Sequence, residues 1–371
     1  MKKVSLFIII VLMFSSICLP AAYADNTVVE CSGLNIVIDG IKQNFSKVPI
    51  AVNNSTLLPL RELLVSLGVP NDNDHIIWST PEKSVTIYKD LTKVNLKLGD
   101  LTAFVNDSPI KLDAAPASYK GSTYIPTRFV AQTLGKKVIW DGQTSTVFIK
   151  GEEDFKNVKS IFDQVEAANK TVKKYKLSSS LSSAIEMAGK TYNLTTDSDS
   201  NIDLEKKLRY DLVDTSSDEV STKKEYYITE NAAFYKELSA TKWQKLSITQ
   251  AQINSMFGLS MQNMDILYAG LVPASTPDDN KIILKGSIYR NEIIDSFTTQ
   301  FSSFGLKLKP SIKNSNMEIV IDKKTNSIIS ITFNFNGDLN ISQAKTTISG
   351  KVVNTYDFAT DFEISLPDEI K

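Results

Sequence analysis

The stretch TLLPLRELLVSLG at residues 56–68 returns along the chain as TYIPTRFVAQTLG at residues 123–135. Both copies hold a proline, an arginine two positions later and a closing leucine–glycine pair. Self-similarity at a fixed offset indicates a duplicated supersecondary unit. The matched positions, each 67 residues apart (126 − 59, 128 − 61, 135 − 68), are Pro59 and Pro126, Arg61 and Arg128, and Gly68 and Gly135.

A tryptophan follows each glycine, and there the offset is smaller. Trp78 and Trp140 lie 62 residues apart (140 − 78), so the first copy holds five extra residues (67 − 62) in the loop after Gly68. That loop contains His75, the one histidine of the chain, beside Asp72 and Asp74. A weak metal contact is one interpretation of this cluster. A solvated loop is the interpretation that we favour, because polar loop residues lie mostly at the surface.

Local patterns predict the same elements in each copy. A proline suits the first turn of a helix and a glycine ends one, which predicts short helices at about 60–67 and 127–134. Leucines at 60, 63, 64 and 67 form one apolar stripe at helical spacing. Short alternating segments before each helix predict strands, and Ile76–Trp78 with Ser84–Tyr88 predicts a hairpin after the first glycine. Each copy is therefore expected to be a small β-rich unit with one short helix.

This order of elements resembles the copper amine oxidase N-terminal-like domain over residues 33–150, with repeats at about 33–90 and 100–150. The motifs that carry the resemblance are the Pro-x-Arg helix, Leu-Gly, Trp-Asp at Trp140-Asp141 and the closing Thr-Val-x-Ile strand. The family is widespread on secreted proteins of Gram-positive bacteria. The resemblance implies no oxidase activity, since the family takes its name from a domain that lies away from the catalytic core.

The composition argues against an enzyme. Copper sites of this kind are ligated mainly by imidazole nitrogen, and one histidine does not supply such a site. The chain contains no Gly-x-Ser-x-Gly elbow, no phosphate-binding glycine loop and no paired-cysteine motif. We therefore expect a non-catalytic protein with no metal and no cofactor.

The arginines and tryptophans of the repeat each admit two interpretations. Arg61 and Arg128 either contact an anionic ligand, or pack their stems on Trp78 and Trp140 while bonding carbonyl groups. Recurrence in both copies favours the second, architectural role. By the same argument the tryptophans are expected to belong to the core.

The first residues have the form of a secretory signal. Lys2 and Lys3 precede an apolar run, and Ala22-Tyr23-Ala24 offers small residues at the positions that a signal peptidase recognises. We expect residues 1–24 to be a signal peptide, although an uncleaved anchor and a lipoprotein are alternatives. Its removal takes Cys18 and leaves Cys31 alone, so no internal disulfide forms. The prediction is a secreted, envelope-associated protein with no transmembrane span in the mature chain.

The second half of the chain has a different sequence pattern. Residues 154–174 predict a helix capped by Asp154 or Asn157, with Val158, Phe162 and Val165 on its apolar face. Alternating strands follow, among them 233–237, 317–322, 346–357 and a terminal 362–364, interrupted by a helical region at about 249–271. Residues 155–371 resemble the LolA-like lipoprotein-carrier half-barrel. In that fold a curved antiparallel sheet encloses an apolar hollow, which Met256, Met261 and Met264 could line.

The predicted fold class is therefore α+β: a duplicated β-rich module followed by a curved antiparallel sheet packed on helices. Charge is balanced, with 41 basic and 42 acidic residues, which gives no indication of a nucleic-acid partner. Two functions stay open. The module binds a cell-wall polymer or an envelope protein, or the half-barrel carries or senses a lipid or another hydrophobic ligand.

Overall fold

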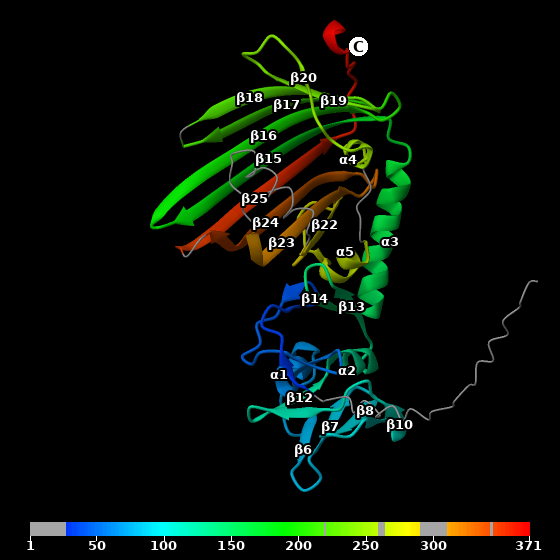
Figure 1. Ribbon diagram of the computed structural model, residues 1–371. Coiled ribbons are helices and arrows are strands. Elements are labelled where there is room, and N and C mark those ends of the chain that lie inside the picture. Colours follow the sequence, from blue (N-terminus) through cyan, green and yellow to red (C-terminus); the bar gives the residue numbers. More distant parts are fainter. Residues whose placement is uncertain (1–26, 219, 259–263, 290–309, 342–343) are drawn as a thin grey trace, which may run out of the picture.

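A computed structural model describes residues 27–371 except 219, 259–263, 290–309 and 342–343. The fold is α+β, as predicted, with a small N-terminal module at one end and a curved sheet at the other (Figure 1). The helix α3 (Glu152–Asn169) begins at the module and runs along one side toward the far end of the curved sheet. The predicted signal peptide at 1–24 lies outside the described residues. No helix among the described residues is long and apolar enough to cross a membrane.

The two copies of the repeat meet at equivalent strands. The central sheet of the module has the order β1-β4-β5-β12-β11, in which β5 pairs antiparallel with β12. Leu58 stands opposite Ile125, and these residues are 67 positions apart, so the pairing is symmetric about this point. The strands are β1 (Val29–Glu30), β4 (Ile50–Val52), β5 (Ser55–Pro59), β12 (Ser122–Pro126) and β11 (Ala117–Tyr119).

Each central strand leads directly into a short helix. α1 (Leu60–Ser66) and α2 (Thr127–Thr133) begin after Pro59 and Pro126, which are their N-cap residues. Gly68 and Gly135 follow the helices with φ angles of 81° and 75°, in the left-handed region that glycine adopts without a Cβ clash. Leu60, Leu63 and Leu64 of α1 are buried. The predicted start and stop of both helices, and the predicted apolar face of α1, are therefore confirmed to within a residue.

Each hairpin is completed by strands of the other copy. In the second copy β13 pairs with β14, and β14 then pairs parallel with β2 of the first copy. In the first copy the sheet order β10-β9-β8-β7-β6 joins β6 and β7 to β9 and β10 of the second copy through the linking strand β8. One buried cluster holds side chains of both copies, so the repeats form a single interleaved core. The strands are β2 (Asn35–Ile38), β3 (Ile41–Lys42), β6 (Ile76–Ser79), β7 (Ser84–Lys89), β8 (Thr92–Lys97), β9 (Thr102–Val105), β10 (Ser108–Lys111), β13 (Lys136–Asp141) and β14 (Thr146–Gly151).

The sheet β13-β14-β2-β3 is shared by the two parts of the molecule. Val147 and Ile149 of β14 belong to the module core, whereas Phe148 between them belongs to the core of the C-terminal domain. Ile36 and Val37 of β2 divide in the same way. Successive side chains of a strand point to opposite faces, so one short sheet contributes to two cores. The module and the C-terminal domain are thus joined by a packed layer and not by a free linker.

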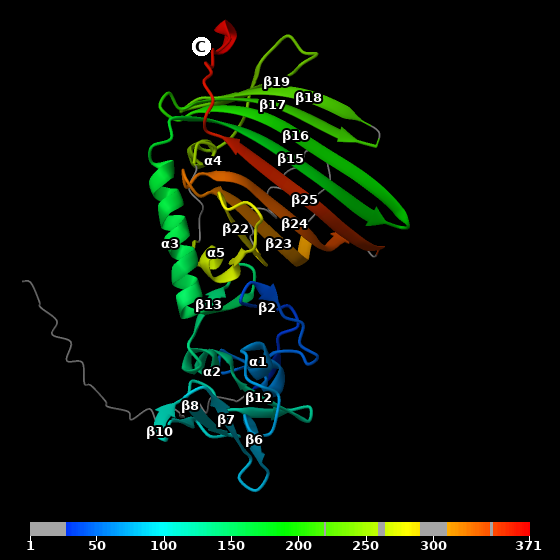
Figure 2. The same ribbon diagram turned by 180° about the vertical axis from the view of Figure 1, so that it is seen from behind.

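The C-terminal domain is an antiparallel sheet of order β20-β19-β18-β17-β16-β15-β25-β24-β23-β22-β21. Its long strands curl together, with α3, α4 (Gln250–Ser255) and α5 (Met264–Gly270) at one end (Figure 2). The strands are β15 (Lys174–Met187), β16 (Lys190–Asp203), β17 (Leu208–Ser217), β18 (Ser221–Ile228), β19 (Ala233–Glu237), β20 (Gln244–Lys245), β21 (Val272–Ala274), β22 (Lys281–Gly286), β23 (Pro310–Asp322), β24 (Ile328–Ile341) and β25 (Ala344–Asp357).

Three details of the predicted second half were wrong. The N-cap of α3 is Gly151, two residues after the apolar run of β14, and neither Asp154 nor Asn157 caps the helix. The helical region predicted at 249–271 divides into α4 and α5, with residues 259–263 between them outside the described residues. No strand forms at 362–364, because this segment has no pairing partner in the described sheet; a short 3-10 helix follows at Asp368–Ile370.

Backbone contacts at the junction involve glycines from both parts. The carbonyl oxygen of Gly40, in the turn after β2, accepts a hydrogen bond of 2.8 Å from the backbone N–H of Ser287. Gly286, at the end of β22, lies against Gly270 at the end of α5, and a Cβ built on Gly286 would overlap the Gly270 carbonyl oxygen. This close approach of one backbone to another requires glycine at position 286.

A buried lysine also holds the junction. Lys150 lies on β14, on the face occupied by Phe148, and is fully buried. Its Nζ donates to the carbonyl oxygen of Leu271, which follows α5. Burial lowers the pKa of Lys150 from 10.5 to about 8, against smaller opposing effects of Asp154 and Asp39.

We predict that Gly286→Ala lowers the free energy of unfolding by about 1–3 kcal/mol, because the new methyl group must displace the backbone at Gly270. Urea unfolding monitored by circular dichroism measures the change. Gly33→Ala is the matched control, since a Cβ there has no neighbour within 4 Å. Equal stabilities of the two variants would contradict the close packing at the junction.

We also predict a rise of stability with pH that depends on Lys150. Between its folded pKa of about 8 and its ordinary value of 10.5, the unfolded chain holds the proton that the folded chain has released. The unfolding free energy of the wild type, relative to Lys150→Met, should therefore increase by about 2 kcal/mol from about pH 7 to about pH 9.5. Lys97→Met, at an exposed position, is the control and should follow the wild type. Parallel pH profiles for wild type and Lys150→Met would refute the assignment.

Candidate functional site

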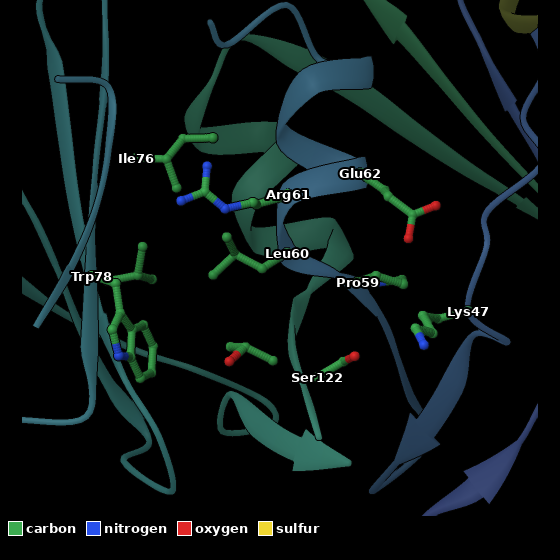
Figure 3. A pocket seen from close by; sticks show the side chains of 10 residues that line it. Lys47, Pro59, Leu60, Arg61, Glu62, Ile76, Trp78 and Ser122 are labelled. Carbon is green, nitrogen blue, oxygen red and sulfur yellow. The ribbon is translucent and has the colours of Figure 1, made fainter. Parts of the chain in front are cut away.

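A groove opens in the module where the first copy of the repeat exposes its motif residues. It has a volume of about 440 Å³ and lies between the start of α1, the strand β6 and the start of β12 (Figure 3). Pro59, Arg61 and Trp78, which the repeat singled out, come together in its wall. The complete lining is Lys47, Pro59, Leu60, Arg61, Glu62, Ile76, Trp78, Val85, Ser122 and Thr123.

The position of each polar group follows from the element that carries it. Arg61 and Glu62 are consecutive in the first turn of α1, so their side chains leave the helix in different directions. Figure 3 shows Arg61 pointing toward Ile76 on the side of Trp78, with Glu62 and Lys47 on the opposite side. Trp78 stands opposite Val85 in the hairpin of β6 and β7. Both residues line the groove, where Val85 is buried and the indole of Trp78 is exposed.

Hydrogen bonds fix the two ends of the groove differently. Glu62 accepts from the backbone N–H of Ser46 at 2.6 Å and from its hydroxyl at 2.7 Å, so both carboxylate oxygens are engaged. Arg61 donates from Nη1 to the side-chain oxygen of Asn71 at 3.0 Å and remains exposed. The guanidinium therefore keeps further N–H groups directed to solvent, since arginine has five donors.

The expectation that the tryptophans belong to the core is wrong. Trp78 is 41% exposed and Trp140 is 49% exposed. Among the described residues, the aromatic rings that have a cation above them pair with lysines and not with Arg61 or Arg128. Both indoles are exposed side chains of hairpin strands, Trp78 on β6 and Trp140 on β13.

The two copies differ in the rest of the groove. The positions 67 residues after Lys47 and Glu62 hold Ala114 and Phe129, so the second copy has neither the amine nor the carboxylate. Arg128 and Trp140 are the counterparts of Arg61 and Trp78, but the second copy has no counterpart of Lys47 or Glu62. Lys47, in a loop, and Ser122, the first residue of β12, lie outside the motif quoted from the repeat and could not be found from it. The groove combines Arg61 and Trp78 of the first copy with Ser122 and Thr123 of the second.

The histidine loop forms no metal cluster. His75 Nδ1 lies 2.8 Å from Asp72 Oδ1, and the same oxygen accepts from the backbone N–H groups of Asp74 and His75. These bonds lower the pKa of Asp72, with the His75 side chain as the largest cause. No group of three or more histidine, cysteine or acidic side chains suited to a metal occurs among the residues that the structure describes. The loop is an exposed turn closed by its own aspartate.

The C-terminal domain holds a smaller cavity of about 210 Å³ at the end of its curved sheet. Met256 lines it. Met264 instead packs against the large core, and Met261 lies outside the described residues. The remaining lining consists of Asn169, Tyr175, Leu177, Arg209, Ser255, Gly258, Ile328, Ile331, Tyr356 and Phe358.

Arg209 is the one charged residue among the described residues that line this cavity, and its bonds are directed to the protein. Its Nε lies 2.7 Å from Asp211 Oδ1, its Nη1 donates to the Met256 carbonyl at 2.9 Å and its Nη2 donates to Ser200. Burial raises the pKa of Tyr175 to about 12, which keeps its hydroxyl neutral. The rings of Tyr175, Tyr356 and Phe358 contact one another with centroids about 6 Å apart. The cavity is therefore an aromatic and apolar hollow whose single cation is already occupied.

Comparison with known proteins assigns the module to a family. Residues 37–149 match the family model described as the copper amine oxidase N-terminal domain, which confirms the resemblance read from the repeat. No curated protein matches the chain significantly.

Three solved structures show a distant similarity to the chain. A DUF1329 family protein from Desulfovibrio piger is 13% identical over 56% of this chain and 95% of its own, with a TM-score of 0.21. A putative outer membrane lipoprotein-sorting protein domain from Vibrio parahaemolyticus is 7% identical over 57% of this chain and 94% of its own, with a TM-score of 0.21. A lipovitellin structure is 8% identical over 52% of this chain and 26% of its own, with a TM-score of 0.26. Likeness at these scores establishes no shared function.

Proposed function

We propose that this chain is a secreted, non-catalytic binding protein of the bacterial cell envelope, and that it binds a cell-wall polymer or an envelope protein through the groove of the first repeat. The observation that supports it is the exposed Trp78 beside Arg61 in a groove of about 440 Å³. Volumes of this size are typical of ligand sites, which combine an apolar lining with a few placed polar groups.

The groove offers three kinds of contact. The indole of Trp78 presents a flat apolar face, which suits stacking on a ring of a ligand. Arg61 supplies outward N–H donors for an anionic or hydroxyl group, and Ser122 and Thr123 supply hydroxyls at the opposite wall. None of these groups is paired with a base or nucleophile in a catalytic arrangement. The chemistry supports recognition and not bond cleavage.

The predicted location rests on the N-terminal sequence. A positive n-region, an apolar run and Ala22-Tyr23-Ala24 support export. An exported protein without an internal disulfide depends on buried apolar side chains for its stability, which agrees with the two large hydrophobic clusters. The family of the module occurs widely on secreted proteins of Gram-positive bacteria, which agrees with this location.

The binding test compares the two copies of the repeat. Full-length protein from residue 25 onward is mixed with purified cell wall of its host, and the bound fraction is measured by sedimentation. We predict that Trp78→Ala with Arg61→Ala weakens binding by about tenfold or more, since loss of an aromatic anchor and an arginine commonly costs above 1–2 kcal/mol. Trp140→Ala with Arg128→Ala removes the same side chains from the second copy and should bind like the wild type. Equal loss in both double variants would contradict a site in the first copy.

A second candidate function is the transport or sensing of a hydrophobic molecule in the C-terminal cavity. The aromatic lining of Tyr175, Tyr356 and Phe358 favours it. The volume of about 210 Å³ is smaller than usual for a ligand site, which places this candidate second.

Native mass spectrometry of protein purified from its own host tests the second candidate. We predict a co-purifying amphiphile in the wild type, and its loss in Leu177→Trp, because the indole would fill the cavity. Ser180→Trp adds the same side chain to the exposed face of β15 and serves as the control. A wild-type spectrum with no added mass would exclude a resident hydrophobic ligand.

A further inference from the structure

The groove of the first repeat adjoins a second cavity at Lys47. This second cavity has a volume of about 460 Å³ and lies between the module and the C-terminal domain. Its module wall comes from two segments, residues 32–36 and 42–49, and its opposite wall from Ser311, Ile312 and Lys313 of β23. Lys47 lines both cavities. Together they extend from Trp78 on the first repeat to Lys313 on the C-terminal domain, and we call this combined surface the track.

The loop that separates the two halves of the track is held in place by Glu62. Ser46 donates its backbone N–H and its hydroxyl to the two oxygens of this carboxylate, which ties the loop of residues 43–49 to α1. Lys47 follows Ser46 and is exposed on the loop. The bonds engage the single carboxylate in the wall of the track, so less of its negative charge faces a ligand.

The track carries four cations. Arg61 and Lys47 lie in the groove, and Lys42 and Lys313 join them in the interdomain cavity. Lys313 pairs with Asp338 at 2.6 Å, whereas no carboxylate among the described residues pairs with Lys42 or Lys47. The Lys42 amine donates to the Lys313 carbonyl and lies 5.6 Å from the Tyr289 ring, which joins the two domains at this point. Since the whole chain carries a net charge of −1, this excess of positive charge is local.

We propose that the track binds one continuous anionic polymer, a flexible chain with phosphate or carboxylate groups, across both domains. The proposal rests on the proposed function of the groove and specifies its ligand. A row of cations attracts a chain with repeated negative charges, and the elongated shape admits an extended chain. The fixed junction between the domains holds the two cavities at a constant separation, so a chain anchored at Trp78 meets Lys42 and Lys313 without a further loss of entropy from domain motion.

A chain that occupies both cavities gains affinity from linkage. Once a segment binds in the groove, the next segment is held near the interdomain cavity at a high effective concentration. A fragment too short to span both cavities lacks this gain. The dependence of affinity on polymer length therefore separates occupation of the track from binding in the groove alone.

The experiment measures the binding of the full-length protein from residue 25 onward by isothermal titration calorimetry. The probes are poly(glycerol phosphate), polygalacturonate, a short fragment of each, and neutral dextran. We expect one of the long anionic polymers to bind at least about tenfold more tightly per chain than its short fragment, with affinity that falls as salt screens the charges. The better of the two polymers identifies phosphate or carboxylate as the recognised group. Dextran should bind no more tightly than the short fragments.

Variants test whether the higher affinity for the long polymer arises from residues of the track. Lys42→Gln and Lys313→Gln should each reduce the affinity for the long polymer severalfold and leave that for the short fragment unchanged. Lys313 has an exposed side chain, so its variant keeps the fold even if Lys42→Gln disturbs the junction. Lys111→Gln, on the exposed strand β10, makes the same charge change away from the track and should bind like the wild type.

The outcomes separate the two proposals. Equal affinities for the short and the long anionic polymers would overturn the track and leave the groove as the site. The same conclusion would follow if the higher affinity for the long polymer persisted in both Lys42→Gln and Lys313→Gln. Tight binding of dextran without salt dependence would overturn the anionic ligand. Absence of binding both to every probe and to whole cell wall would overturn the proposed function together with the track.

Discussion

The sheet β13-β14-β2-β3 is the constraint on which the rest of the structure depends. The strand β14 is buried on both sides, with Val147 and Ile149 in one core and Phe148 in the other. Neither core is complete without this layer, and each stabilises the strands that the other needs. Removing either part of the molecule would expose a row of apolar side chains to water, at a cost of roughly 25 cal/mol for each Å². The module and the half-barrel therefore form one cooperative unit, in contrast to two domains joined by a flexible linker.

The same constraint explains the unusual residues at the junction. Lys150 is also buried on β14, and its amine donates to the Leu271 carbonyl at the end of α5. Gly40, Gly270 and Gly286 permit three backbone segments to approach one another where the layer meets the C-terminal sheet. A rigid junction also fixes the distance between the groove on the first repeat and the wall of β23. Surface positions on both domains can then act on one ligand, which separately folded domains would achieve only with an entropic penalty.

Duplication produced symmetry at the centre of the module and asymmetry at its surface. Leu58 faces Ile125 across the pairing of β5 with β12, and each of these strands leads directly into a helix. At the surface, Lys47 and Glu62 have Ala114 and Phe129 as counterparts, so only the first copy combines the exposed tryptophan with an amine and a carboxylate. The shared core needs side chains of both copies, whereas a single binding groove needs the full set of polar groups only once. The exposed Trp140 and Arg128 in the second copy thus provide an internal comparison for the site.

Local sequence patterns were sufficient to predict α1, α2 and the long strands of the C-terminal domain. Proline before and glycine after each apolar stripe set α1 and α2 to within a residue, because these signals act through the backbone of a few neighbouring residues. The count of one histidine argued against copper chemistry, and alternation predicted the long strands of the second domain. Tertiary structure decided the exchange of strands between copies, the two-sided burial of β14 and the exposure of Trp78 and Trp140. It also brought Lys47 of a loop to the groove and Lys313 of a distant strand to the same track. These features depend on contacts between residues far apart in the chain, and no local pattern records which partner a strand or a loop will meet.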